Sequence, residues 1–131
     1  MSMRHLYLAA LTAVLACAST GTGSRSARTG NLLTAVEIAD KHAENNSVYD
    51  AVARLRPNWL APRGPSSASG SSIETAQVFV DGQAVGDVNA MRSIQAYYVD
   101  ALEYFDSSQA GAKFGIRAGG AGAIEVRMKK P

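Results

Sequence analysis

An alternating segment near the end of the chain constrains the fold most strongly. Ile124, Val126 and Met128 occupy alternate positions, and Glu125 and Arg127 lie between them. Because successive side chains of a strand point to opposite faces, this pattern predicts a strand with one packed and one solvated face. A strand of this kind is typical of a sheet that helices cover on a single side.

A second strand pattern leads into a tight turn. Val78 and Val80 alternate with Phe79, and the pair Asp81-Gly82 follows. Both residues of that pair tolerate positive φ, so they predict a two-residue hairpin with a short return strand over 83–85. We expect this hairpin and the alternating segment near the end of the chain to share one sheet.

Capping residues predict two helices before the hairpin. Thr34 and Glu37 have the spacing of a capping box, which predicts a helix that continues to residue 43. Ser47 is expected to be the N-cap of a second helix. Pro57 ends that helix, because the residue before a proline is pushed out of the α region.

Two further helices are expected after the hairpin. Asp87 can cap the first of them, and Ser107 or Ser108 can cap a last helical turn that runs through Lys113. Gly115 stands where a helix C-terminus favours a residue in the left-handed αL conformation.

These elements, with a further strand over 101–105, define an α+β fold class. We expect a small mixed sheet of about four strands with short helices packed on it. The chain has 131 residues, which is enough for one domain. We place that domain at 31–131, with a Ser/Gly/Pro-rich loop at 61–72.

The first thirty residues are predicted to be an export segment and a tether. Residues 1–16 have a basic start and then an apolar run, which is the pattern of a signal peptide. Residues 17–30 are rich in Ser, Thr and Gly, a composition that predicts a flexible tether. The chain is therefore expected to be exported.

The single cysteine, Cys17, follows the apolar run directly and resembles the lipidated cysteine of a bacterial lipoprotein. We interpret Cys17 as a lipid anchor, which would be the only attachment of the chain to a membrane. The alternative is ordinary signal-peptidase cleavage after Ala18, at a small-x-small site that would discard the cysteine.

The glycine-rich stretch and the ionisable residues do not form a pattern that predicts catalysis. Residues 115–122 lead into a strand, whereas a phosphate-binding loop leads into a helix N-terminus. His42 is the only histidine beyond the signal segment, and we expect it on the polar side of a surface helix. The acidic residues lack the spacing of a metal site. We therefore predict a protein that is not an enzyme, with no cofactor and no metal.

Two arginines near the only tryptophan form a candidate interaction surface: Arg56, Trp59 and Arg63. An exposed Trp59 would be an aromatic anchor at an interface. We favour the alternative, in which Trp59 packs under the end of the preceding helix. The net charge of +2 does not predict binding to nucleic acid, and we expect none.

The order of several short segments resembles the plug domain of TonB-dependent outer-membrane receptors. These segments are a Val-Asp-Gly strand end at 80–82, an aromatic-Gly pair at 114–115 and a Gly-x-Ile-x-Val closing strand at 122–126. The resemblance covers nearly all of the chain beyond the export segment. It implies a plug-like fold in a chain in which no barrel sequence follows the plug.

The resemblance also implies a place and a role. We expect a non-enzymatic accessory module on the periplasmic side of the outer membrane, which docks on an envelope protein such as a receptor or barrel. The alternative is an unrelated small periplasmic α+β module that binds a peptide or small ligand. A deep pocket with converging ionisable groups in the structure would instead favour an enzyme.

Overall fold

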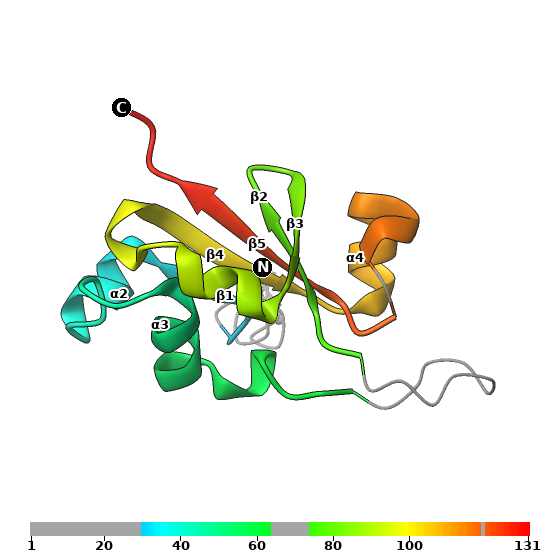
Figure 1. Cartoon of the computed structure of the whole chain (residues 1–131), viewed down its shortest axis with the longest axis horizontal. Coiled ribbons are helices and arrows are strands. Elements are labelled where there is room, and N and C mark those ends of the chain that lie inside the picture. The colour runs from blue at the N-terminus through cyan, green and yellow to red at the C-terminus, as the bar shows by residue number, and fades with distance from the viewer. Residues whose placement is uncertain (1–29, 64–73, 119) are drawn as a thin grey trace, which may run out of the picture.

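The computed structural model describes residues 30–63, 74–118 and 120–131, and within them the chain forms one five-stranded mixed sheet (Figure 1). The fold class is α+β, as the sequence predicts. The strand order is β1-β4-β5-β2-β3. The strands are β1 (Leu32–Thr34), β2 (Gln77–Val80), β3 (Gln83–Asp87), β4 (Val99–Phe105) and β5 (Ala123–Met128).

The alternating segment near the end of the chain is the central strand, β5. It pairs with β4 in the antiparallel direction and with β2 in the parallel direction, where Val78 lies opposite Ile124. The expectation that β5 and the hairpin share one sheet is confirmed. Because β5 has a neighbour on each side, its backbone groups can be satisfied within the sheet.

The hairpin between β2 and β3 forms as predicted. Asp81 has φ of 46° and Gly82 has φ of 83°, which are the positive values that a two-residue turn of this type needs. The return strand β3 is longer than expected and continues to Asp87. Its pairing with β2 shifts register after Ala84, so Val85 is an extra, bulged residue.

The sequence did not predict β1, which brings the sheet to five strands in the described residues instead of about four. Leu32–Thr34 pairs with β4 in the antiparallel direction, and Leu33 is fully buried. A segment of three residues is too short to show a strand period. Its extended conformation therefore follows from its pairing with β4.

The two helices before the hairpin begin at the predicted caps. Helix α2 (Ala35–Asp40) has Thr34 as N-cap, and helix α3 (Val48–Leu55) has Ser47 as N-cap. The expected end of α2 at residue 43 is wrong, since the helix ends at Asp40. Helix α3 ends before Pro57, as predicted.

The helices after the hairpin differ in detail from the predictions. Asp87 does cap the next helix, but that helix is a 3₁₀ helix over Val88–Ser93. The expected caps of the last helix, Ser107 or Ser108, are wrong. The N-cap of α4 (Ser107–Phe114) is Asp106, which forms a capping box with Gln109. An ionised carboxylate accepts backbone hydrogen bonds strongly at this position.

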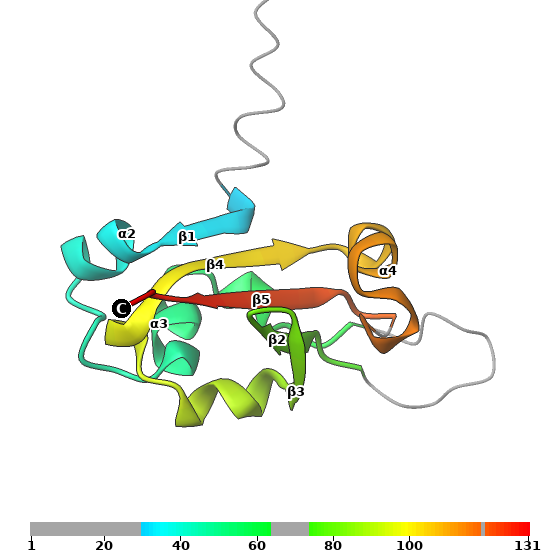
Figure 2. The same cartoon turned by 90° about the horizontal axis from the view of Figure 1, so that it is seen from above.

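The main core lies on one face of the sheet, under α2, α3 and the 3₁₀ helices Pro57–Trp59, Val88–Ser93 and Ala96–Tyr98 (Figures 1 and 2). Helix α3 contributes the apolar stripe of Val48, Ala51 and Val52, all fully buried. The largest fully buried side chains of this cluster are Trp59, Leu33, Ile38, Met91, Leu102 and Ile124.

A smaller core on the opposite face corrects the prediction that helices cover a single side. Helix α4 lies at the end of the sheet where β4 ends and β5 begins (Figure 2). Phe79 packs there with Ala110 of α4, and Phe114 stacks on Phe79 at 3.9 Å between ring centroids. Glu125 is only 8% exposed, although we expected it on a solvated face.

Candidate functional site

Two adjacent tyrosines form the most exposed aromatic surface in the described part of the chain. Ala96, Tyr97 and Tyr98 form a 3₁₀ helix before β4, in which Ala96 is buried while Tyr97 and Tyr98 are 59% and 57% exposed. Their rings meet edge to face, with centroids 5.4 Å apart. Such a pair places a large apolar area and two hydroxyl groups in solvent.

Lys129, which follows β5, holds this pair in place from the neighbouring strand at the same end of the sheet. Its backbone N–H donates a hydrogen bond of 2.8 Å to the carbonyl of Tyr98. Its ammonium group donates to the carbonyl of Tyr97 and lies 4.8 Å from the centre of the Tyr97 ring. We call these three residues, Tyr97, Tyr98 and Lys129, the tyrosine surface.

An open pocket of about 320 Å³ adjoins the tyrosine surface. Asp100 reaches it from a bulge in β4, where the pairing with β5 shifts register. Asp81 reaches it from the hairpin turn, and its Oδ1 accepts a hydrogen bond of 3.1 Å from the backbone N–H of Met128. The residues of this mixed-charge pocket are Asp81, Asp100, Arg127, Met128 and Lys130.

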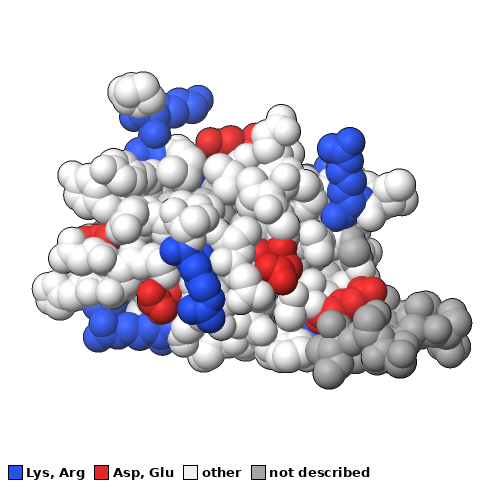
Figure 3. Space-filling model, in the orientation of Figure 1, with Lys and Arg blue, Asp and Glu red and all other residues white. Residues whose placement is uncertain are grey.

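The charges around the pocket are of both signs and are only loosely paired with one another. Arg127 Nη2 lies 3.9 Å from Glu103 Oε2, and both side chains are partly exposed. An exposed pair at that distance contributes little to stability, so Arg127 is free to bind another group. Figure 3 shows cationic and anionic side chains scattered over one face of the molecule, separated by uncharged surface.

The residues of the predicted interaction surface do not lie together on the outside of the molecule. Trp59 is 1% exposed and stacks on Tyr104 at 5.9 Å between ring centroids. Trp59 is therefore packed inside the fold, as the favoured alternative predicts, and is not an exposed aromatic anchor. Arg63 is exposed, and its guanidinium lies 4.9 Å above the Tyr104 ring.

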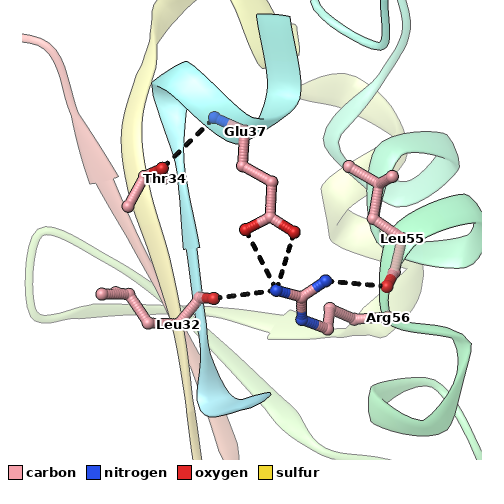
Figure 4. Close-up of polar contacts among 5 residues, drawn as sticks. All are labelled: Leu32, Thr34, Glu37, Leu55 and Arg56. Atoms are coloured by element: carbon pink, nitrogen blue, oxygen red, sulfur yellow. Dashed lines mark hydrogen bonds and ion pairs between the residues drawn. The ribbon is translucent and has the colours of Figure 1, made fainter. Parts of the chain in front are cut away.

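Arg56 joins three elements instead of facing a partner (Figure 4). Its guanidinium lies 2.8 Å from Glu37 Oε1 of α2, and it donates hydrogen bonds to the carbonyls of Leu32 in β1 and Leu55 in α3. The capping box predicted at Thr34 is accordingly half formed. Thr34 Oγ1 accepts from the backbone N–H of Glu37, while the Glu37 carboxylate binds Arg56.

Tyr104 has a pKa above the ordinary value of a tyrosine. Burial raises the pKa of the Tyr104 phenol, and it outweighs the nearby Arg63, which lowers the pKa; Asp106 raises it further. The Tyr104 hydroxyl donates to the carbonyl of Ala121 at 3.3 Å. The residue is therefore a neutral hydrogen-bond donor inside the fold.

The glycine-rich stretch forms a close structural connection into β5. Gly115 ends α4 with φ of 68° and ψ of −151°. The positive φ agrees with the prediction, but this ψ lies outside the αL region that was expected. Gly122 has φ of 94°, and a Cβ there would lie 2.5 Å from the carbonyl oxygen of Phe105. This contact explains why glycine is needed directly before the central strand.

The remaining predicted features contribute no site in the described residues. His42 is exposed in the turn after α2, with φ of 53°, and not on the helix itself. Among the residues that the structure describes, no three His, Cys, Asp or Glu side chains gather to hold a metal ion. None of the helices in those ranges is long and apolar enough to cross a membrane.

Several predictions concern residues outside the described ranges. The signal peptide at 1–16, the anchor Cys17 and almost all of the tether at 17–30 lie there, as do residues 64–72 of the predicted loop. Arg63 and Glu74, the described residues on either side of 64–73, are joined by backbone hydrogen bonds in both directions.

The tyrosine surface is the feature that sequence reasoning missed. The sequence predicts that the helix capped by Asp87 ends near this pair, and it indicates no role for either tyrosine. The signal that was available is the pair Tyr97-Tyr98, since two adjacent tyrosines cannot both face the core of one helix. Its exposure depends on the short 3₁₀ turn that buries Ala96 instead.

No protein-family model and no curated protein matches this chain. The resemblance to plug domains thus rests on the order of segments in the sequence and stays a hypothesis.

Proposed function

We propose that this chain is a non-enzymatic binding module of the bacterial envelope, similar to the plug domain of a TonB-dependent receptor. It is exported, anchored through a lipid on Cys17 and held on the periplasmic side of the outer membrane. It docks on an envelope protein, with a receptor or barrel as the expected partner.

The observation that carries this proposal is the tyrosine surface beside the mixed-charge pocket. Tyrosine is enriched at protein interfaces because it offers a large, rigid contact area with a polar end. Tyr97 and Tyr98 offer that area without serving the core. The adjoining pocket adds carboxylates and cations that can fix the orientation of a partner.

The arrangement of the plug-like segments is consistent with this proposal. The Val-Asp-Gly strand end belongs to β2, which lies parallel to the closing strand β5. The aromatic-Gly pair, Phe114 and Gly115, lies at the end of α4, where Phe114 packs against β2 through Phe79. Two of these segments thus lie side by side in the sheet, and the third packs against it from α4.

A second candidate function follows from the pocket. Its volume of about 320 Å³ is near the lower limit of small-ligand sites. Under this alternative the chain is an unrelated periplasmic module that binds a peptide or small ligand carrying both charges. Asp100 would contact the cationic group of that ligand, and Arg127 or Lys130 its anionic group.

Capture from envelope membranes tests the proposal. The tagged exported chain is mixed with detergent-solubilised outer membranes, and bound proteins are identified by mass spectrometry. We expect an outer-membrane barrel or receptor to be recovered, and the double substitution Tyr97→Ala with Tyr98→Ala to lose it.

A matched control distinguishes binding through the tyrosine surface from non-specific binding. Val36 in α2 is 69% exposed and belongs to neither the tyrosine surface nor the pocket. The variant Val36→Ala should recover the same partner as the wild type. Recovery of no envelope protein, or equal recovery by the tyrosine variant, would contradict the proposal and favour the small-ligand alternative.

The anchor is tested separately by the mass of the mature N-terminus. A lipid on Cys17 is the expected result, whereas a chain that begins at Ser19 would refute the anchor without affecting the binding role.

A further inference from the structure

The two edges of the sheet differ in how well they are protected. At β1 the carbonyl of Leu32 accepts a hydrogen bond of 3.2 Å from Arg56, and α2 begins directly after the strand. At β3 the residues Gln83–Val85 are exposed, and Val85 keeps 45% of its surface in solvent. Figure 2 shows β3 at the outer side of the hairpin. The open edge is therefore β3.

The hairpin geometry identifies which backbone groups face outward. In a two-residue hairpin the residues that flank the turn exchange both backbone hydrogen bonds, and the following residue directs its N–H and C=O away from the partner strand. Val80 and Gln83 flank the turn here, so Ala84 is the outward-facing residue. The bulge at Val85 follows immediately, which limits the straight edge to a short stretch centred on Ala84.

The segment that forms this edge carries acidic residues and no basic residue. Asp81 lies at the turn and Asp87 at the end of β3, and no Lys or Arg occurs between residues 76 and 91. Natural sheet edges are commonly blocked by lysine or proline, and β3 contains neither. The middle of the edge is neutral and apolar, through Ala84 and Val85.

We propose that the outer edge of β3 binds an extended segment of a partner protein as a sixth strand. The segment carries an apolar residue against Val85 and a lysine or arginine that faces Asp87. The Asp81 carboxylate is not available to it, because it points to β5 and accepts a hydrogen bond from the backbone N–H of Met128. This inference rests on the proposed binding function and names the chemistry of the partner. A second copy of the chain fits less well, because its β3 carries no basic residue that could lie opposite Asp87.

A peptide titration tests this proposal directly. The probe is the synthetic peptide Lys-Thr-Val-Thr-Val-Thr-Lys, added to the ¹⁵N-labelled exported chain and followed by the amide shifts of the protein. We expect saturable shifts confined to the residues of the β2–β3 hairpin. The charge-reversed peptide with glutamate at both ends should bind about ten-fold more weakly at low ionic strength.

Two substitutions at one residue provide the matched control. Ala84→Pro removes the outward N–H and leaves the inward pairing of the hairpin in place, because proline is tolerated on an edge strand. Ala84→Val keeps that N–H and favours the strand. Peptide binding should be lost in Ala84→Pro and kept in Ala84→Val, with both variants folded by circular dichroism.

Other outcomes overturn the proposal. Absent or scattered shifts, equal binding of the two peptides, equal binding by both variants, or dimers of the chain that Ala84→Pro abolishes would each refute it. Successful capture of an envelope protein without peptide binding would refute the strand-accepting edge alone. Peptide binding without capture of any envelope protein would refute the proposed envelope partner instead.

Discussion

Arg56 shows how one side chain can hold several elements of a small fold. Its guanidinium contacts β1, α2 and the end of α3 at once, through Leu32, Glu37 and Leu55. Arginine suits this role because its planar group presents several donors in a fixed geometry. A basic residue near a tryptophan resembles a binding patch in the sequence, yet here the contacts of Arg56 are internal.

Replacing Arg56 should therefore destabilise the fold. In Arg56→Met the apolar stem remains, but Glu37 and the Leu32 carbonyl lose their partner, at a cost of about 1–3 kcal/mol in the free energy of unfolding. The measurement is urea denaturation. Arg54→Met is the control, because Arg54 is exposed on the same helix and should change stability by less than about 0.5 kcal/mol. Equal stability of the two variants would show that the Arg56 contacts contribute nothing.

Tyr104 gives a prediction for alkaline solution. Its pKa is raised in the folded chain because burial disfavours the phenolate. The neutral form thus contributes stability that is fully present below the unfolded pKa of about 10 and is lost as the pH rises through the higher folded value. The free energy of unfolding of Tyr104→Phe should therefore fall less than that of the wild type between pH 8 and 11. Parallel curves for the wild type and the variant would refute the raised pKa.

At the scale of elements, the parts that depend on neighbours in sequence could be predicted and the parts that depend on tertiary contact could not. Ser47, Asp87 and the Asp81-Gly82 turn act within a few residues, so their patterns identified two helix starts and the hairpin. Strand β1 exists through its pairing with β4. The burial of Glu125 likewise depends on Lys113 of α4, which no local pattern indicates.

The ion pair between α4 and β5 should fasten the helix to the sheet. Lys113 Nζ lies 2.6 Å from Glu125 Oε2 and 4.2 Å from the centre of the Phe105 ring. Lys113→Met would leave the buried carboxylate without its partner and cost about 1–3 kcal/mol in urea denaturation. The double variant with Glu125→Gln should recover part of that loss. A double variant that is less stable than Lys113→Met alone would contradict this account.

At the scale of the whole molecule, the strand order places the best-buried strand and the proposed binding edge in different parts of the sheet. Strand β5 is central, between β4 and β2, and is buried along most of its length. Strand β3 is at the edge and mostly exposed. The tyrosine surface adjoins the end of β5, and the mixed-charge pocket includes the turn before β3. The candidate site could not be predicted because it is assembled from the ends of three strands.

This separation predicts a gradient of hydrogen exchange across the sheet. Amides of β5 should exchange only through global unfolding, whereas the outward amide of Ala84 should exchange through local opening, at least about 2 kcal/mol lower in free energy. The variant Arg56→Met tests the distinction, because its lower global stability should reduce protection in β5 and leave that of Ala84 unchanged. Native-state exchange followed by NMR measures both. If Ala84 were as protected as β5, or lost protection in parallel with it, the edge of β3 would not be open to a partner strand.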